Sequence, residues 1–402
     1  MFGYSLRKIC LVIYTFLMGV SIFLVSLYSS ESFRTWQKHM GPPTGFIQRR
    51  FNITAFGKSS HGKFEEGPWS RGRDMNKGDP PYADRHPVKP FNGKHFGQEE
   101  CVPGYVQSAM SRFHPSFNPA EHLFMNTSYE SWKYSGDSLH NLKLPFGLGK
   151  GNKKLLDSIL NKLSEFSKPD RFGKGCKRCI LVASGGVSLG HNLGKTIDTY
   201  DIVIRMNNAP IKGYEDYIGS KTSFRFQYPE TAFSTPEDLE EDSDVVFVAY
   251  KVADLYWLDA VLKNEVPSIA SSFTIGSNHK YWKSVPAGLA KSPQNVRFIN
   301  PHVVLLAAYE YIGTNNIPSI GIVAMVTALH YCDQVDITGY GFSERLPYHY
   351  YDLSVLGQPV ANHDWDSEKD FILQLLRYGI IGKDLTGMYT QEVKDKWQDI
   401  DN

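Results

Sequence analysis

The sequence predicts an α/β domain with a mostly parallel sheet and helices on both faces, preceded by a single transmembrane helix and a flexible stem. Three observations predict this architecture. Short apolar runs typical of buried strands recur after residue 150, helical hydrophobic patterns accompany them, and one long uncharged apolar stretch lies near the N-terminus.

The apolar stretch covers residues 9–28 (ICLVIYTFLMGVSIFLVSLY) and is about as long as a helix that crosses a bilayer. Arg7 and Lys8 precede it and Glu31 follows it, so the positive-inside rule places residues 1–8 in the cytosol. A cleaved signal peptide is the alternative, but the run lacks a clear Ala-x-Ala cleavage pattern. We therefore predict a signal anchor with type II topology.

The segment after the span has the composition of a stem. Residues 29–96 lack hydrophobic periodicity and collect Gly, Pro and charged side chains, which indicates a flexible segment. Residues 97–402 are then the lumenal domain. Asn52 and Asn126 each begin an Asn-x-Ser/Thr sequon on the predicted lumenal side, so both are candidate glycosylation sites.

The overall composition argues against nucleic-acid binding. The 402 residues contain 43 Lys plus Arg and 42 Asp plus Glu, which gives a net charge of +1. A chain of this balance offers no general positive field for a phosphate backbone. The aromatic content of 13% is typical of a globular body rather than of a disordered chain.

Four cysteines lie outside the span, which contains Cys10. They are Cys101, Cys176, Cys179 and Cys332, and an even number in an oxidising compartment predicts two disulfides with three pairings open. A redox or zinc role for the Cys176-x-x-Cys179 pair is the alternative. No second Cys-x-x-Cys or His-x(3–5)-His pattern supports a metal site.

The secondary-structure pattern becomes regular after residue 150. Leu155 to Phe166 show helical spacing that ends before Pro169. Residues 320–331 are apolar nearly all round, as in a buried helix, and residues 367–378 are amphipathic with an acidic first turn. Buried strands are predicted at 180–183, 202–204, 245–249 and 335–338. Ligands of such sheets bind at the carboxyl ends of the strands.

The loop after the first strand, Ser184 to Gly190, is rich in small residues and is either a tight turn or a phosphate cradle. It fits neither the dinucleotide fingerprint nor the P-loop. The next strand ends in Asn207 and Asn208 before Pro210, which gives either an Asn turn or hydrogen-bonding groups beside the loop.

These residues resemble the motifs of animal sialyltransferases. Residues 179–230 resemble the long sialylmotif, including Asn-Asn-Ala-Pro and Tyr-Pro-Glu, and residues 318–342 resemble the short motif. His349-Tyr-Tyr-Asp resembles the third motif, and His363 with Glu368 fits the very short His-x(4)-Glu motif. The glutamate alone is ambiguous, since an acidic residue in a first helical turn already favours the helix dipole.

The resemblance covers roughly residues 100–390 and implies transfer of sialic acid from CMP-sialic acid to a terminal galactose, with inversion and without a metal. It also implies a Rossmann-like, modified nucleotide-sugar glycosyltransferase fold in the Golgi lumen. Tyr-Pro-Glu and Lys251-x-x-Asp254-Leu-x-Trp257 are similar to the branch that makes α2,3 linkages. Ser184 with its following glycines, and Pro145-Phe-Gly, are similar to the lactosylceramide sialyltransferase branch, which hints at a glycolipid acceptor.

Roles for single residues follow from the same resemblance. His363 matches the general base and His349 matches the donor to the CMP phosphate, and neutral imidazole has suitable basicity for removing a hydroxyl proton. The competing interpretations are a surface histidine at 363 and a histidine within an aromatic cluster at 349. The family's disulfide joins Cys179 to Cys332, which leaves Cys101 with Cys176. The positions that match CMP contacts are Ser184, Asn207, Ser319, Gly321 and Gly341.

Two other functions stay open from the sequence. Asp242-Ser-Asp244 has the form that holds a divalent cation in metal-dependent glycosyltransferases, although here it precedes the strand instead of following it. A catalytically silent glycan-binding membrane protein is the second alternative. A homodimer formed through the span is also left open. Residues 273–292 show no clear pattern, and their place between the motifs suggests a part in shaping the acceptor site.

Overall fold

The computed structural model describes residues 101–132, 139–166, 175–233, 243–267, 281–341, 346–356 and 363–390, with only the backbone for 353–356. All of them belong to the unit Glu66–Asn402. The predicted cytosolic tail, span and stem, and the sequon at Asn52, lie outside these residues. Within them, no helix is both long and apolar enough to cross a membrane. Asn126 is described and exposed, and its side-chain oxygen accepts a hydrogen bond from the Ser128 amide.

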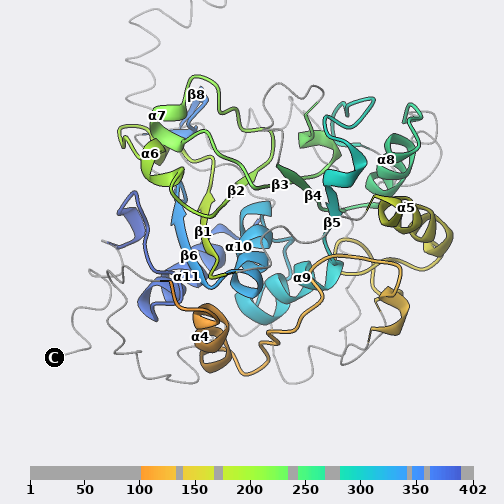
Figure 1. The fold of residues 1–402 in the computed structure, drawn as a ribbon, viewed down its shortest axis with the longest axis horizontal. Helices are drawn as coiled ribbons and strands as arrows, with labels where there is room; N and C mark the ends of the chain where they lie inside the picture. Colours follow the sequence, from red (N-terminus) through yellow and green to blue (C-terminus); the bar gives the residue numbers. More distant parts are fainter. Residues whose placement is uncertain are drawn as a thin grey trace, which may run out of the picture. The chain divides into compact units, whose positions relative to one another are not determined.

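The centre of the unit is a six-stranded sheet whose neighbouring strands are all parallel (Figure 1). In β1, Ile180 lies opposite Val203 of β2 on one side and Asp336 of β6 on the other. The spatial order is β5 (Val296–Phe298), β4 (Asp244–Phe247), β3 (Phe224–Gln227), β2 (Ile202–Met206), β1 (Arg178–Val182) and β6 (Gln334–Thr338).

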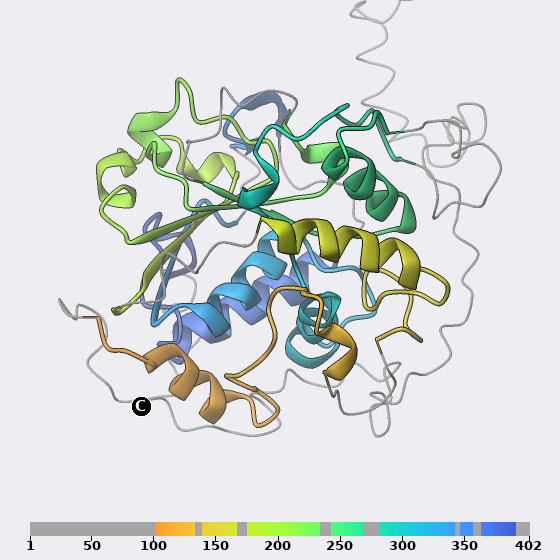
Figure 2. The same ribbon diagram turned by 45° about the vertical axis from the view of Figure 1, so that its right-hand side comes forward.

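Helices cover both faces of this sheet (Figures 1 and 2), as predicted. Successive strand residues point to opposite faces, so each face has its own core. The first core contains α4 (Tyr105–Phe113), α9 (Pro301–Leu305), the π-helical turn η9 (Leu306–Ile312), α10 (Ile320–Tyr331) and α11 (Trp365–Arg377). The opposite face carries α5 (Lys153–Glu165), α6 (Gly194–Ile197), α7 (Glu215–Ile218) and α8 (Val252–Leu262).

The strands and helices predicted after residue 150 are all present, with ends that shift by a few residues. The sequence patterns missed β3 and β5. In β3 the residues are Phe-Arg-Phe-Gln, and Arg225 is fully buried, so no apolar run marks the strand. Its guanidinium lies over the ring of Phe233, 4.9 Å from the centroid, and donates to the carbonyl oxygen of Asn207 at 2.9 Å. These tertiary contacts stabilise the buried charge of Arg225, which would otherwise be unfavourable inside a central strand.

A small antiparallel pair lies outside the main sheet. It joins β7 (Pro347–His349) to β8 (Asp352–Leu356), with His349 opposite Asp352. This pair was not predicted, because the residues of β7 are half-buried proline, tyrosine and histidine rather than an apolar run.

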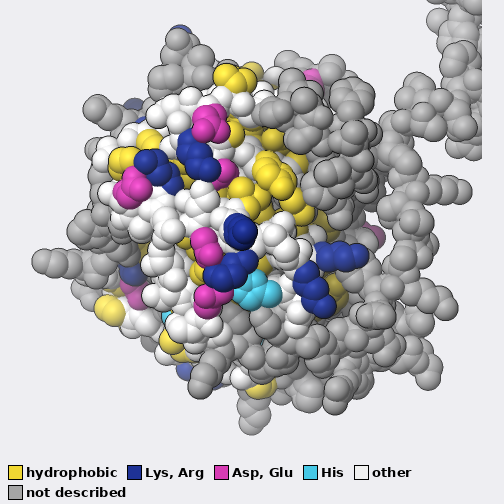
Figure 3. Space-filling view, turned by 90° about the vertical axis from the view of Figure 1, so that its right-hand side faces the viewer, with side chains coloured by type: hydrophobic (Ala, Val, Ile, Leu, Met, Phe, Trp, Pro, Cys, Tyr) yellow, Lys and Arg dark blue, Asp and Glu magenta, His cyan; other side chains and the backbone are white. Residues whose placement is uncertain are grey.

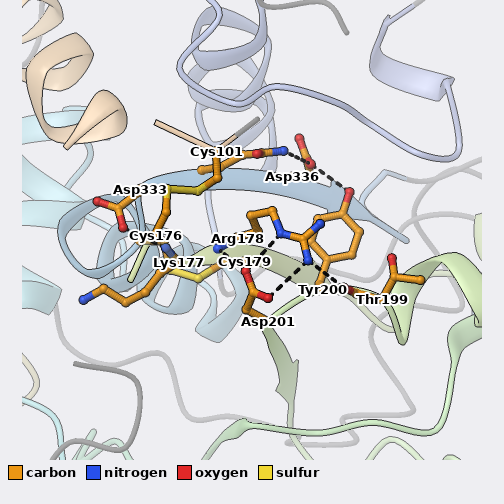
Figure 4. Close-up of polar contacts among 12 residues, drawn as sticks. Cys101, Cys176, Lys177, Arg178, Cys179, Thr199, Tyr200, Asp201, Asp333 and Asp336 are labelled. Carbon is orange, nitrogen blue, oxygen red and sulfur yellow. Dashed lines mark hydrogen bonds and ion pairs between the residues drawn. A yellow bond between two sulfur atoms is a disulfide. The ribbon is translucent and has the colours of Figure 1, made fainter. Parts of the chain in front are cut away.

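Both disulfides lie at the amino-terminal end of β1 (Figure 4). Cys179 of β1 is bonded to Cys332, which ends α10, and Cys101 is bonded to Cys176. These are the pairings that the family resemblance implied. Because Cys176 and Cys179 have different disulfide partners, they do not form the redox or zinc pair that the sequence left open.

Charged side chains of both signs are interspersed on the face that carries α5 and α8. Figure 3 shows Lys and Arg beside Asp and Glu on this face, with hydrophobic side chains between them. On α5, for example, the Lys153 ammonium is 2.8 Å from the carboxylate of Asp157 and 2.9 Å from that of Glu130. Such exposed pairs contribute little to stability.

Candidate active site at the carboxyl edge of the sheet

The order of the strands along the sheet changes direction between β1 and β6. β1 has β2 on one side and β6, the last strand of this sheet along the chain, on the other. In open parallel sheets, the crevice at such a switch point is where ligands bind. Three of the predicted contact residues follow strands at this edge: Ser184 follows β1, Asn207 follows β2 and Gly341 follows β6.

The loop after β1 is packed so tightly that only glycine fits at two positions. A Cβ atom at Gly185 would clash with the carbonyl oxygen of Gly339, and one at Gly186 would clash with that of Pro347. The amide of Gly185 donates to the Gly339 carbonyl at 3.0 Å, and Gly185 bridges to the backbone of His349. The glycines therefore allow close packing that places β7 beside the loop, and the Gly185 amide is used within the protein.

Several polar atoms at this edge are buried without a hydrogen-bond partner among the described residues. Asn207 has a left-handed backbone, with φ of 55°, and its side-chain oxygen is one of these atoms. Leaving a buried polar atom unpaired costs free energy, so such a group is a natural contact for a polar ligand. The atoms at this edge are Ser188 Oγ, Asn207 Oδ1, Gln227 Oε1 and Thr338 Oγ1.

The start of α10 is held by a carboxylate from α11. Ser319 caps α10, since its hydroxyl accepts from the Ile322 amide at 3.3 Å. The Ser319 amide in turn donates to Glu368 Oε1 at 2.6 Å. Burial raises the pKa of Glu368 to about 7, although hydrogen bonds from Ser319 oppose the shift. Gly321 lies beside the ring of Tyr340, whose hydroxyl donates to the Gly321 carbonyl at 3.1 Å.

His363 lies just before α11, and its ring orientation is fixed by one backbone contact. Nδ1 is 2.7 Å from the carbonyl oxygen of Ile317. A carbonyl oxygen can only accept, so Nδ1 carries the hydrogen and Nε2 keeps the lone pair in the neutral ring. Burial lowers the pKa of His363, which favours this neutral form near pH 7. Trp365 packs edge-on against the ring, at 5.0 Å between centroids.

His349 ends β7 within a group of aromatic rings. Its ring stacks on Tyr351 at 4.8 Å with an interplanar angle of 8°, and Tyr348 lies 4.2 Å away between centroids. Burial lowers the pKa of His349, and the charge of Asp352 opposes that shift only in part. The aromatic cluster predicted for this histidine is present, and it holds the ring at the carboxyl edge.

Backbone hydrogen bonds connect these segments around the half-buried Tyr348. Burial raises the pKa of Tyr348 to about 12, with further contributions from Tyr351, Glu368 and Tyr228. The Tyr350 amide, one residue after β7, donates to the Ser184 carbonyl after β1 at 3.0 Å, and the Ser319 amide before α10 donates to Glu368 of α11 at 2.6 Å. The structure thus gathers the motif residues of the sequence at one edge of the sheet.

The acidic pair considered for metal binding lies elsewhere. Asp242 is outside the described residues. Asp244 begins β4 at the opposite, amino-terminal edge, and its carboxylate is 2.8 Å from Nε of Arg297. In the part of the chain that the structure describes, no cluster of three or more His, Cys, Asp or Glu side chains could hold a metal ion.

Sequence reasoning missed a buried ion cluster after β3 and β4. Lys251 Nζ lies 2.7 Å from Glu230 Oε1 and 2.5 Å from Asp254 Oδ1, and all three side chains are almost completely buried. The sequence marked Lys251 and Asp254 only as features of a branch. The one available signal was the position of Lys251 shortly after the apolar run 245–249. Its partner Glu230 lies far away in the sequence, so residue spacing could not identify it.

Comparisons with known proteins identify the family of this chain. The model of glycosyltransferase family 29 (sialyltransferase) matches residues 125–380. The chain therefore belongs to family 29 of the glycosyltransferases, the sialyltransferases.

Two mouse relatives are similar over most of the chain. One is the CMP-N-acetylneuraminate-beta-1,4-galactoside alpha-2,3-sialyltransferase of Mus musculus, 35% identical over 71% of this chain and 77% of the relative. The other is the lactosylceramide alpha-2,3-sialyltransferase of Mus musculus, 32% identical over 72% of each chain.

Two solved structures share the fold. The crystal structure of a mammalian sialyltransferase has a TM-score of 0.54 and 23% identity, and it covers 71% of this chain and 97% of its own. The same coverage holds for a mammalian sialyltransferase in complex with Gal-beta-1-3GalNAc-ortho-nitrophenol, with a TM-score of 0.53 and 24% identity.

Proposed function

We propose that this protein transfers sialic acid from CMP-sialic acid to the 3-hydroxyl of a terminal galactose on a glycolipid or glycoprotein. The family membership and the two α2,3-sialyltransferases among its relatives support this activity. The observation that carries the mechanism is the His363 ring, whose Nδ1 is bonded to the Ile317 carbonyl so that Nε2 is left as a base.

In the proposed step, the galactose oxygen forms a bond to the anomeric carbon while the bond from that carbon to the phosphate oxygen breaks. The electron pair of the broken bond stays on CMP, and the hydroxyl proton passes to Nε2 of His363. Attack opposite to the leaving group inverts the anomeric carbon. His349 donates a hydrogen bond to the departing phosphate and stabilises its growing charge.

The donor nucleotide is proposed to bind across the carboxyl ends of β1, β2 and β6. The unpaired side-chain oxygen of Asn207 and the tight backbone at Gly341 support this placement. The proposed CMP contacts are Ser184, Asn207, Ser319, Gly321 and Gly341. We also propose that the enzyme needs no metal and works as a type II protein of the Golgi membrane, as the family resemblance implies.

A transfer assay with the full chain in detergent tests this function. CMP-sialic acid is supplied with lactosylceramide or with a galactose-terminated glycoprotein, each with and without EDTA, and the linkage of the product is determined. We expect α2,3-linked product that resists the chelator. Loss of transfer in EDTA would favour a metal-dependent reaction, and absence of transfer to any galactose acceptor would favour a silent glycan-binding protein.

A further inference from the structure

One tryptophan beside the proposed site is half exposed. Trp282 exposes 50% of its surface, whereas Trp257 in α8 exposes 1%. Large aromatic side chains that stay in contact with water at the rim of a site are frequent ligand contacts, because their apolar body and ring face remain available.

The backbone of this segment is fastened to the sheet and to α8. The amide of Trp282 donates to Glu230 Oε1 at 2.8 Å. The hydroxyl of the preceding residue, Tyr281, donates to the Ala253 carbonyl at 3.2 Å. The main chain of Trp282 is thus held at the turn after β3, and the side chain of the neighbouring Tyr281 is held at the start of α8, while Trp282 itself stays half exposed.

The buried ion cluster fixes the ring itself. Lys251 is 4% exposed, and its ammonium lies 4.0 Å from the centroid of the Trp282 ring. This is a cation–π contact with an ammonium that Glu230 and Asp254 also hold. The ammonium occupies one face of the indole ring, and half of the surface of Trp282 stays exposed for a ligand.

Other aromatic rings connect Trp282 to the proposed active site. Its ring centroid lies 5.7 Å from that of Tyr228, edge to face, and 6.3 Å from that of Tyr250. Tyr228 and Tyr250 follow β3 and β4 at the carboxyl edge. Tyr250 belongs to the hydrophobic core cluster that contains Ile320 and Tyr340, and Tyr228 packs against the same cluster, so these rings join Trp282 to the start of α10 and the loop after β6.

We propose that Trp282 is an acceptor-binding residue, and that the exposed surface of its indole ring stacks on a sugar ring of the β-galactoside acceptor. This inference rests on the proposed function. The axial 4-hydroxyl of galactose leaves one face of the sugar with only C–H groups, which suits an aromatic surface. Glu230, Lys251 and Asp254 position the ring in advance, so little conformational entropy is lost when the acceptor binds.

Kinetics of two variants and a control test the inference in the full chain in detergent, with lactose as the acceptor probe. Trp282→Ala should raise the KM for lactose about tenfold, and Trp282→Phe should raise it less because a ring remains. The KM for CMP-sialic acid, the release of CMP without acceptor, and the Tm should stay close to wild type. Tyr256→Ala is the matched control, because Tyr256 of α8 is also 50% exposed.

Each outcome decides between the two proposals. A lactose KM in Trp282→Ala within twofold of that of Tyr256→Ala would overturn the acceptor role while the transferase activity of wild type stands. A rise in the KM for CMP-sialic acid equal to the rise for lactose would also overturn it, because a general distortion would then explain the defect. If wild type transfers nothing to lactose or to any other galactoside, the proposed function fails, and this inference fails with it.

Discussion

Glu368 of α11 accepts a hydrogen bond of 2.6 Å from the amide of Ser319 and thereby joins the starts of α10 and α11. The start of α10 carries the proposed CMP contacts Ser319 and Gly321, and His363 lies just before α11. The hydrogen bond therefore sets the distance between these two segments. It gives the glutamate of the His-x(4)-Glu motif a structural task in addition to its favourable interaction with the α11 dipole.

The raised pKa of Glu368 predicts a pH-dependent contribution to stability. Its pKa is 4.5 in a model compound and about 7 in the fold, so the folded state favours the protonated carboxyl. The contribution is present below pH 4.5 and is lost as pH rises through 7, and it amounts to at most about 3 kcal/mol.

The neutral variant Glu368→Gln should lack this contribution. Between pH 4.5 and 7.5, we expect the free energy of unfolding of wild type to fall relative to that of the variant, as measured by urea titration at several pH values. Parallel pH profiles for the two proteins would show that the carboxyl does not titrate in this way.

The close approach at Gly186 predicts that a methyl group there disturbs the site. In Gly186→Ala, the new Cβ would clash with the Pro347 carbonyl and push away the strand that ends in His349. We expect kcat to fall at least tenfold. Gly288→Ala is the control, since no atom lies within 4 Å of a Cβ there. Equal activity of the two variants would mean that the position of β7 does not matter for turnover.

The two disulfides should contribute unequally to stability. Cys179 and Cys332 are fully buried between β1 and the end of α10, whereas Cys101 and Cys176 are partly exposed. Replacing a buried pair by alanine removes packing as well as the cross-link, so Cys179→Ala/Cys332→Ala should cost about 4–5 kcal/mol.

The Cys101→Ala/Cys176→Ala variant should cost less, because its cross-link lies nearer the surface. Urea unfolding at constant pH compares the two double variants. A larger loss of stability on removal of the more exposed bridge would contradict this ranking.

His349 and His363 are expected to act at different points of the reaction. Loss of the hydrogen bond to the departing phosphate should slow every reaction of the donor, so His349→Ala should lower both transfer and the release of CMP without acceptor, by about a hundredfold. Release of CMP is followed directly by chromatography. If His349→Ala slows transfer alone, the histidine acts on the acceptor side instead.

Much of the sheet could be predicted from the sequence, because β1, β2, β4 and β6 each contain a short, mostly apolar run of residues. β3 was missed because Arg225 is buried there, and its charge is compensated by contacts that only the folded chain creates. The motif residues of the site were identified through the family resemblance. Their meeting at one edge depends on strand order, which hydrophobic periodicity does not specify.

The ion cluster of Glu230, Lys251 and Asp254 could not be predicted from the sequence either, because it also depends on which strands are neighbours. Glu230 lies after β3 and Lys251 lies after β4, and they meet only because those strands are parallel neighbours. Trp282 gave no pattern of its own, and its exposure and its contact with Lys251 are visible only in three dimensions.

The turnover of His363→Ala is the measurement that tests the proposed mechanism most directly. Formation of sialylated galactoside from CMP-sialic acid is compared with wild type in the same detergent, with CMP affinity measured by calorimetry as a check on the site. Removal of the base should lower kcat by about 10² to 10⁴-fold while CMP binds as before. Turnover within a few-fold of wild type would contradict the assignment of His363 as the base.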